Sequence, residues 1–271
     1  MSGIIKSLYV YPIKSCKGIS VQSAVATPFG LKYDRQWMIV EKDSGKFITQ
    51  RTYPKMTQII CGLTSTHLTL SFDGLSFSVA FALDGLVVDS TVWRDTIKGK
   101  IQDVPDMNEA LSKFLNTNVC LLKFAGNRVV EKESAPVGTV VQYADRYPYT
   151  IADISDFNNF NNFLKGQDLA PITIERFRTN IVFEGVPADV GTGRKSFTIT
   201  TNIDTLRGVF CEPCARCPMP DLNPETGEKT NHQIKRNLKV YRDTGKDWFS
   251  THSTLDITWE VLLCVGDKVA L

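Results

Sequence analysis

The sequence of 271 residues lacks the features of membrane-spanning and nucleic-acid-binding chains. No apolar run reaches the roughly 18 residues that a spanning helix needs, so we expect no membrane span. No long run of Lys and Arg occurs and the net charge is only +2, so charge gives no reason to expect a nucleic-acid partner. Residues 1–6 lead directly into strand-like sequence, which leaves no room for a signal peptide or presequence. We therefore expect a cytoplasmic protein.

Motifs that would let the chain collect electrons are also missing. No G-x-G-x-x-G follows a predicted strand, so the dinucleotide-binding fingerprint is absent. No C-x-x-C-H haem attachment site occurs, and the cluster of three cysteines has no fourth cysteine nearby for an iron–sulfur cluster. A redox activity in this chain would therefore need a separate protein as its electron source.

The cysteines are few but unevenly placed. Their number, seven, is odd, which fits a reduced intracellular setting better than a disulfide framework. Three of them fall in the segment Cys-Glu-Pro-Cys-Ala-Arg-Cys-Pro at 211–218. Pro213 and Pro218 fix φ there, so we predict a rigid loop that presents one sulfur. Arg216 beside Cys217 should favour the thiolate, the form that binds metals or acts as a nucleophile.

The hydrophobic pattern predicts a β-rich α+β chain. At 42% hydrophobic residues it can form a substantial core. Strands are predicted at 4–11, 21–27, 36–41, 47–51, 59–63, 67–72, 75–80, 92–101, 119–124, 181–183, 197–201, 259–264 and 268–271. Helices are predicted at 107–115, from a cap at Asp153 or Ser155 to about 164, and at 234–241. We take polar residues 126–141 as a connection, which gives domains at 1–125 and 126–271, and 191–195 as a loose turn.

Basic residues near the N-terminus form a candidate anion site. The turn Lys14-Ser15-Cys16-Lys17-Gly18 offers backbone N–H groups, a hydroxyl and two ammonium groups, which together can hold a phosphate. A solvated turn is the alternative. Arg35 and Arg51 lie near opposite ends of a predicted hairpin pair, and with Lys14 they would form a positive pocket lip.

A second candidate site, made of one arginine and one asparagine, precedes the strand at 181–183. Arg178 and Asn180 are two positions apart and would share one face of an extended chain. A guanidinium and an amide entering a buried strand are costly unless they are paired. The partner would be either a ligand anion or an internal carboxylate.

Eight short motifs, taken together, resemble the MOSC proteins, those similar to the mitochondrial amidoxime-reducing component and its bacterial relatives. They occur in family order over nearly the whole chain. They are Tyr11-Pro12-Ile13-Lys14-Ser15-Cys16-Lys17-Gly18, Asp34-Arg35 with Trp37, Thr49-Gln50-Arg51, Tyr147-Pro148-Tyr149, Phe177-Arg178-Thr179-Asn180-Ile181-Val182, Cys214-Ala215-Arg216-Cys217, Asn223-Pro224-Glu225-Thr226-Gly227 and Val265-Gly266-Asp267.

The resemblance implies a β-barrel-like N-terminal domain followed by a MOSC β-barrel domain with a few helices, and a molybdenum–pterin cofactor between them. Cys217 would be the metal ligand and the catalytic residue. The implied cofactor-binding residues are Lys14, Ser15, Arg35, Arg51, Arg178, Asn180 and Arg216. The implied reaction is the two-electron reduction of N-hydroxylated compounds, such as amidoximes and hydroxylamines, with a separate haem or iron–sulfur protein as electron donor. Pyridoxal phosphate binding is a further implication.

The chain departs from the family pattern at several positions near this site. Ala215 stands where relatives often have serine, and Pro218-Met219-Pro220 replaces a segment that usually includes threonine. Residues 154–156 do not match the hydroxyl-rich helix start of relatives, and 186–196 is short and different. The pocket wall is therefore expected to differ there.

Two other interpretations of the cysteine cluster remain open. Cys211, Cys214 and Cys217 with His232 would make a structural zinc site, although the second half of the usual ligand pattern is missing. Alternatively, the protein would carry sulfur or cofactor without turnover, with Cys217 holding a persulfide. A thioredoxin-like pair of Cys214 and Cys217 lacks its usual βαβ context.

Overall fold

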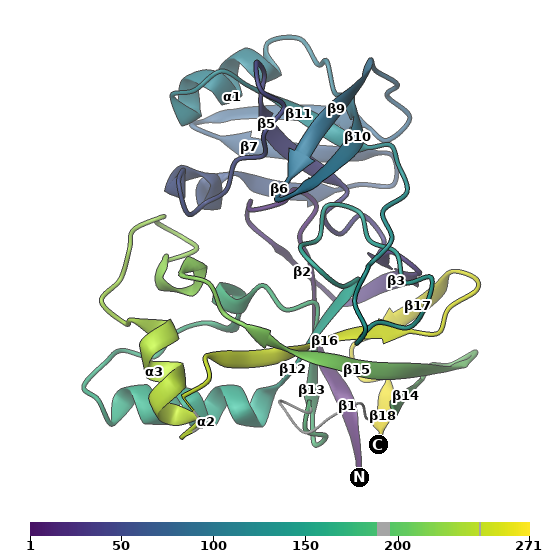
Figure 1. Ribbon diagram of the computed structural model, residues 1–271, viewed down its shortest axis with the longest axis vertical. Coiled ribbons are helices and arrows are strands. Elements are labelled where there is room, and N and C mark those ends of the chain that lie inside the picture. Colours follow the sequence, from purple (N-terminus) through teal and green to yellow (C-terminus); the bar gives the residue numbers. More distant parts are fainter. Residues whose placement is uncertain (189–195, 244) are drawn as a thin grey trace.

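The computed structural model describes residues 1–188, 196–243 and 245–271. The loose turn predicted at 191–195 lies outside these residues. Two bodies are stacked along the long axis of the molecule (Figure 1). The upper body contains α1 and the strands from β5 to β11, and the lower body contains β1, the strands from β12 to β18, α2 and α3.

The lower body is a closed barrel of seven strands. They pair in the order β13-β12-β16-β15-β14-β18-β1, and β1 pairs again with β13 to complete the ring. The seven strands are β1 (Ser2–Val10), β12 (Tyr149–Asp153), β13 (Ile181–Glu184), β14 (Ser196–Thr200), β15 (Thr205–Ala215), β16 (Trp248–Leu255) and β18 (Lys268–Ala270). Closure removes the exposed sheet edges and encloses a core of side chains that includes Ile5, Phe183, Phe197 and Phe210.

The first strands of the chain belong to the lower body rather than to the upper one, β1 and β2 in the barrel sheet and β3 and β4 in a separate small sheet. β1 lies between β18 and β13, and β2 (Ile19–Val21) pairs with β1. β3 (Ser23–Thr27) pairs with β4 (Gly30–Leu31) and β17 (Val261–Cys264). The predicted domain boundary between residues 125 and 126 stays a prediction. In space, strands from both ends of the chain contribute to one barrel.

The upper body consists of two antiparallel sheets and one helix around a second core. The sheets have the orders β5-β11-β10-β9 and β6-β7-β8. Their elements are β5 (Trp37–Glu41), 3-10 helix η1 (Pro54–Gln58), β6 (Ile60–Leu63), β7 (His67–Phe72), β8 (Leu75–Ala80), β9 (Val87–Val92), β10 (Asp95–Ile101), α1 (Met107–Leu115) and β11 (Val119–Phe124). Trp37, Met56, Leu111 and Leu121 are fully buried in this core.

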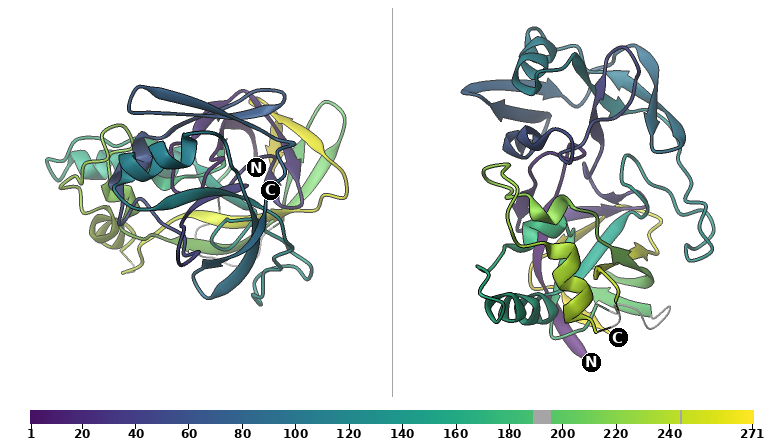
Figure 2. Two further views of the ribbon diagram at one scale, coloured as in Figure 1. Left: turned by 90° about the horizontal axis from the view of Figure 1, so that it is seen from above. Right: turned by 60° about the vertical axis from the view of Figure 1, so that its left-hand side comes forward.

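Helices α2 (Ile154–Lys165) and α3 (Ile234–Tyr241) lie together on one flank of the barrel (Figure 2). Asp153 caps α2 by accepting a hydrogen bond from the Ser155 backbone N–H at 2.9 Å. Two further 3-10 helices, η2 (Ile174–Phe177) and η3 (Met219–Asp221), border the helices. The core under α2 includes Phe177, which stacks on Phe249 with ring centroids 3.8 Å apart. The phenylalanines of α2 are thus packing residues.

The predicted fold class is confirmed, as are the three helices. The strand predictions need correction in several places. Residues 47–51 form only an isolated bridge, between Val40 and Phe47. Strands β12 and β16 were not predicted. β16 buries Ser250, Thr251 and Ser253, so its sequence lacks hydrophobic alternation. In the described parts of the chain, no helix is long and apolar enough to cross a membrane.

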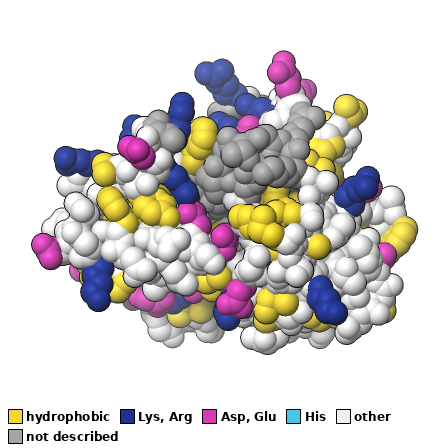
Figure 3. Space-filling model, turned by 90° about the horizontal axis from the view of Figure 1, so that it is seen from below, with side chains coloured by type: hydrophobic (Ala, Val, Ile, Leu, Met, Phe, Trp, Pro, Cys, Tyr) yellow, Lys and Arg dark blue, Asp and Glu magenta, His cyan; other side chains and the backbone are white. Residues whose placement is uncertain are grey.

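The two chain ends meet at the barrel end far from the upper body, since Ser2 pairs with Ala270. Seen from below, the molecule carries single basic and acidic side chains scattered among hydrophobic ones (Figure 3). The visible part of that face therefore has no concentration of one charge.

Candidate functional site

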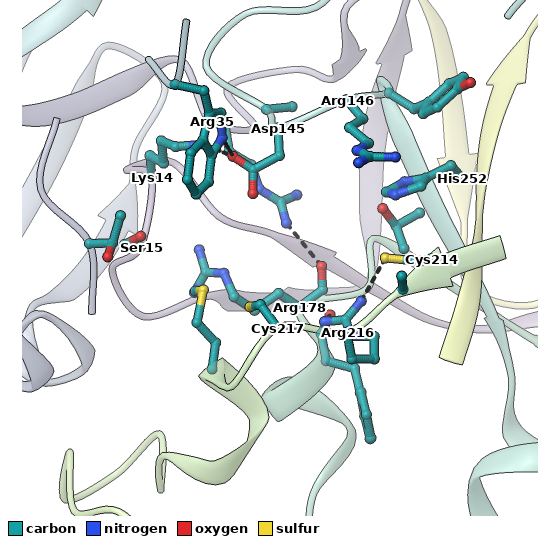
Figure 4. A pocket seen from close by; sticks show the side chains of 18 of the residues that line it. Lys14, Ser15, Arg35, Asp145, Arg146, Arg178, Cys214, Arg216, Cys217 and His252 are labelled. Carbon is teal, nitrogen blue, oxygen red and sulfur yellow. Dashed lines mark hydrogen bonds and ion pairs between the residues drawn. The ribbon is translucent and has the colours of Figure 1, made fainter. Parts of the chain in front are cut away.

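A pocket of about 450 Å³ lies where the upper body meets the barrel (Figure 4). Phe47 and Trp93 line it from the upper body, and Cys214 and His252 line it from the barrel. All eight predicted site residues also line this pocket. They are Lys14, Ser15, Arg35, Arg51, Arg178, Asn180, Arg216 and Cys217. The sequence therefore identified side chains that the fold brings together from five separate segments.

The pocket is strongly positive. Among the described residues, six that line the pocket are cationic, against the single carboxylate of Asp145. The six cations are Lys14, Arg35, Arg51, Arg146, Arg178 and Arg216. Such a concentration of charge in a cavity that is partly shielded from solvent favours an anionic ligand.

Lys14 follows β1 and enters the pocket wall as a buried side chain, with 6% of its surface exposed. Its ammonium donates hydrogen bonds to the Tyr143 carbonyl oxygen at 2.8 Å and to the Asp145 carboxylate. Burial lowers the pKa of Lys14, and Asp145 opposes that effect. Ser15 is also buried and adopts a left-handed backbone, with φ of 68°. The solvated-turn alternative is therefore wrong for these two residues.

Asp145, which the sequence analysis did not identify, pairs with Lys14 from a half-exposed position. The Trp93 indole N–H also donates to its carboxylate at 2.9 Å. Partial burial acts to raise the pKa of Asp145, but Lys14 and Trp93 outweigh it and hold the pKa well below its usual range. Asp145 therefore neutralises one of the cations and ties the upper body to the barrel.

Arg35 links several elements beneath the pocket. Its Nη1 donates to Asp34 Oδ2 at 2.5 Å and to Asn180 Oδ1 at 3.1 Å. Its Nη2 donates to the Arg178 carbonyl oxygen at 2.9 Å, and its guanidinium lies 4.4 Å from the Tyr11 ring centroid. Much of the donor capacity of Arg35 is thus used within the protein.

Arg178 has a different backbone from the one predicted. It ends η2 in the left-handed region, with φ of 54°, so it does not share an extended strand face with Asn180. Its Nη1 donates to the Cys16 carbonyl oxygen at 2.6 Å, whereas its buried Nη2 has no partner in the described structure. Burial, and then Arg35, lower the pKa of Arg178 to about 10. No internal carboxylate pairs with this guanidinium among the described residues.

Asn180 is the hydrogen-bonded junction of three segments. Its Oδ1 accepts from Arg35 and, at 3.3 Å, from the Thr150 backbone N–H. Its Nδ2 donates to the Tyr9 carbonyl oxygen at 3.3 Å. The side chain is 1% exposed. Asn180 therefore shapes the pocket by joining β1, β12 and Arg35.

We expect Asn180→Ala to lower the free energy of unfolding by about 2 kcal/mol, because it leaves buried backbone groups without partners. The measurement is urea denaturation, in which the midpoint should fall while the slope is unchanged. Asn158→Ala, on the exposed face of α2, is the matched control and should change stability by less than about 0.5 kcal/mol. Equal stability of the two variants would contradict the junction role.

The cysteine segment is a strand, not the predicted loop, as far as Ala215. β15 continues through Cys211 and Cys214, pairing with β16 and shifting register near Pro213. Pro213 has no backbone N–H to donate to β16. The strand tolerates this proline because it lies beside a shift in the register of the pairing. Of the three cysteines in this segment, Cys217 alone lies beyond the end of the strand, and it is partly exposed in the pocket.

Arg216 contacts a different thiol from the one predicted. Its Nη1 donates to Cys214 Sγ at 2.9 Å, and its Nη2 donates to the Phe177 carbonyl oxygen at 2.7 Å. Burial would raise the pKa of Cys214, but Arg216 and His252 lower it to about 6. The expectation that Arg216 holds Cys217 as a thiolate is therefore not supported, because the guanidinium turns back towards the strand.

The zinc interpretation does not fit the geometry. Outside residues 189–195 and 244, no three His, Cys, Asp or Glu side chains are grouped to hold a metal ion. His232 contacts the Thr230 hydroxyl and the Ala170 carbonyl oxygen, and it does not line the pocket. Cys211 packs with Ala135 and Tyr147.

The remaining pocket residues form its rim. Arg51 and Arg146 are exposed. The Arg51 guanidinium lies 4.6 Å from the Trp93 ring centroid, and Arg146 donates to Glu212 at 3.0 Å. Among the divergent positions, Ala215 and Met219 line the pocket, whereas 154–156 do not.

Two family sequence profiles match the chain. The MOSC N-terminal beta barrel domain matches residues 2–118, and the MOSC domain matches residues 138–270. Mitochondrial amidoxime-reducing component 1 of Danio rerio is 28% identical over 264 residues, which cover 89% of this chain and 75% of that protein. The same component of Mus musculus is 25% identical over 259 residues, covering 89% and 72%.

A longer relative matches as well. Molybdenum cofactor sulfurase of Drosophila erecta is 28% identical over 238 residues, which cover 82% of this chain but only 28% of the sulfurase. This chain therefore corresponds to little more than a quarter of that protein. The two domain matches, in the order in which the fold presents them, establish that the chain belongs to the MOSC family, with a MOSC N-terminal beta barrel domain followed by a MOSC domain.

Proposed function

We propose that this protein is a molybdenum-cofactor-dependent reductase of N-hydroxylated compounds, such as amidoximes and hydroxylamines, with Cys217 as the metal ligand. The observation that carries the proposal is a partly exposed thiol in a pocket lined by six cations. Relatives named amidoxime-reducing components, which this chain matches over most of their length, support the choice of substrate class.

The residues present fit a phosphorylated pterin with a soft metal. Arg178 Nη2 is a buried donor without a partner in the described structure, and Arg178 lines the pocket. A buried donor of this kind is costly unless a ligand satisfies it, and guanidinium groups match phosphate oxygens well. Cys217 supplies sulfur, the ligand type that soft metal centres prefer. The volume of about 450 Å³ lies within the range of ligand pockets.

The chain's own residues would bind and orient the cofactor. Arg178, with Lys14 and Ser15 beside it, would hold the phosphate, and Arg35 and Asn180 would keep Arg178 in place. Arg51 at the rim and Arg216 beside Cys217 would add positive charge. When bound, the metal would supply the two-electron chemistry that cleaves the N–O bond, while the protein holds and orients the group.

A cofactor or sulfur carrier is the second candidate, because the similarity to molybdenum cofactor sulfurase favours it. Reduction of benzamidoxime by a chemically reduced viologen dye separates the two, since only a reductase consumes the dye with release of water. Dye consumption at the rate of a protein-free blank would leave the carrier.

Pyridoxal phosphate has no support from this pocket. That cofactor is usually held through a lysine, and Lys14 is the only lysine among the described residues that line the pocket. Its ammonium is already bonded to Tyr143 and Asp145.

We expect the purified protein not to oxidise NADH or NADPH by itself, because the sequence carries no dinucleotide fingerprint, haem attachment motif or complete iron–sulfur ligand set. A separate haem or iron–sulfur protein would supply electrons, through an encounter too weak to co-purify. The measurement is NADH consumption with an N-hydroxylated substrate, with and without an added electron-transfer chain. Rapid consumption by the lone protein would contradict this expectation.

The cytoplasm remains the proposed location. None of the seven cysteines forms a disulfide, and all of them lie in the described residues. Reduced thiols are typical of that compartment.

A further inference from the structure

A second sulfur in the pocket wall has chemistry that the proposed function does not use. Cys214 lines the pocket from β15 and is 7% exposed. Figure 4 shows it grouped with Arg216 and His252 at one side of the pocket. A thiol becomes reactive when cations stabilise its thiolate and a reagent can reach it.

Two side chains stabilise the thiolate of Cys214. Arg216 Nη1 donates to Sγ at 2.9 Å, and Arg216 is itself buried, so its charge is weakly screened. His252 lies against the same thiol and is held by stacking on Tyr147, with ring centroids 5.1 Å apart. Arg216 Nε and His252 Nδ1 are buried without partners in the described structure. These two nitrogen atoms can therefore still form hydrogen bonds to a group that enters the cluster.

The other charged groups near this cluster are already engaged. Glu212 lies opposite His252 in the β15–β16 ladder, but its carboxylate accepts from Arg146 at 3.0 Å and from Ser134 at 3.1 Å. Tyr147, stacked on His252, shares a short hydrogen bond with Ser134. The direct electrostatic partners of Cys214 are therefore cationic or neutral.

The other buried thiols show the contrast. Burial raises the pKa of Cys61 to about 12 and raises that of Cys120, although Arg178 partly opposes the effect at Cys61. At Cys214, burial acts in the same direction, but Arg216 and His252 outweigh it and lower the pKa to about 6. Burial alone would thus make Cys214 inert.

We propose that Cys214 is a reactive thiolate and the site at which small electrophiles, peroxides above all, modify this protein through the pocket. The thiolate attacks one oxygen of the peroxide, an S–O bond forms and the O–O bond breaks. With hydrogen peroxide, the departing hydroxide takes one proton and leaves as water. The sulfur loses two electrons to the peroxide and becomes a sulfenic acid.

Modification would also change Arg216. A neutral sulfenic acid removes the anionic partner of a guanidinium that is adjacent to Cys217 in the chain. Oxidation would therefore reach the proposed metal-binding end of the pocket. The reactivity itself belongs to the protein chain and does not depend on the proposed reductase activity.

The test is alkylation of the folded protein, as purified, by iodoacetamide from pH 4.5 to 9, read for each cysteine by peptide mass spectrometry. At pH 7 we expect Cys214 to react at least about tenfold faster than Cys61 and Cys120, with a midpoint near pH 6. The Cys217→Ser variant should keep this profile. In His252→Phe the midpoint should move upward, because one stabilising group is lost.

A second arm uses hydrogen peroxide followed by dimedone, which traps sulfenic acids. We expect the adduct on Cys214 in the wild type and in Cys217→Ser. Slow labelling of Cys61 and Cys120 checks in every sample that the core is folded. The proposal is overturned if Cys214 stays unlabelled at pH 7, or if its midpoint lies at the ordinary thiol value of about 8.5.

Discussion

Cys217→Ala should yield a folded protein that retains less than about a tenth of the molybdenum of the wild type and loses amidoxime reduction by about 100-fold or more. Mutation of a residue that only hydrogen-bonds to a metal ligand typically lowers metal affinity or activity by 10–100-fold. Loss of the ligand itself should lower them at least as much. Cys217 is partly exposed and follows the end of β15, so its removal disturbs little packing. The measurements are metal analysis by mass spectrometry and the dye-coupled assay.

Cys211→Ala is the matched control. Cys211 lies in β15, packed with Ala135 and Tyr147, and does not line the pocket. We expect a modest loss of stability with metal content near that of the wild type. Loss of metal in the Cys211 variant, with Cys217→Ala unaffected, would reverse the assignment.

Arg178→Lys should reduce retention of the pterin by about 10-fold or more. Lysine keeps the charge but loses the second nitrogen of the fork, the one that is buried without a partner. A hydrogen bond to a charged group contributes roughly 1.5–3 kcal/mol, which corresponds to about 10–100-fold in binding. The measurement is pterin content after gel filtration, determined by fluorescence of its oxidised form.

The control for this variant is Arg207→Lys, at an exposed position of β15. Arg176 is unsuitable although it lies two positions from Arg178. It is buried, and its Nη1 donates to the Pro220 and Leu222 carbonyl oxygens at 3.0 and 3.1 Å. Wild-type pterin content in the Arg178 variant would remove this residue from the proposed site.

Residues close to a local motif were predictable from the sequence. Lys14, Arg178 and Cys217 belong to short motifs whose order along the chain indicated a shared pocket. The helix at 107–115 followed from its apolar spacing, and its bounds agree with α1. Such features depend on neighbouring residues only.

Residues whose role depends on pairing between distant strands were not predictable. His252 lies on β16, a strand hidden by its buried serines and threonines, and it meets Cys214 only through the β15–β16 ladder. Asp145 precedes the Tyr147-Pro148-Tyr149 motif, which was the one local signal available for it. The preference of Arg216 for Cys214 over its neighbour Cys217 also depends on the direction of the side chain at the end of β15.

Analysis of the purified protein for metal and pterin tests most directly whether the pocket is a molybdenum-cofactor site. The protein should be produced in a host that makes the cofactor. We expect about one molybdenum and one pterin per chain, with both lost together on denaturation. Zinc in equal amount to the chain, or a folded protein with neither metal nor pterin, would contradict the proposed site.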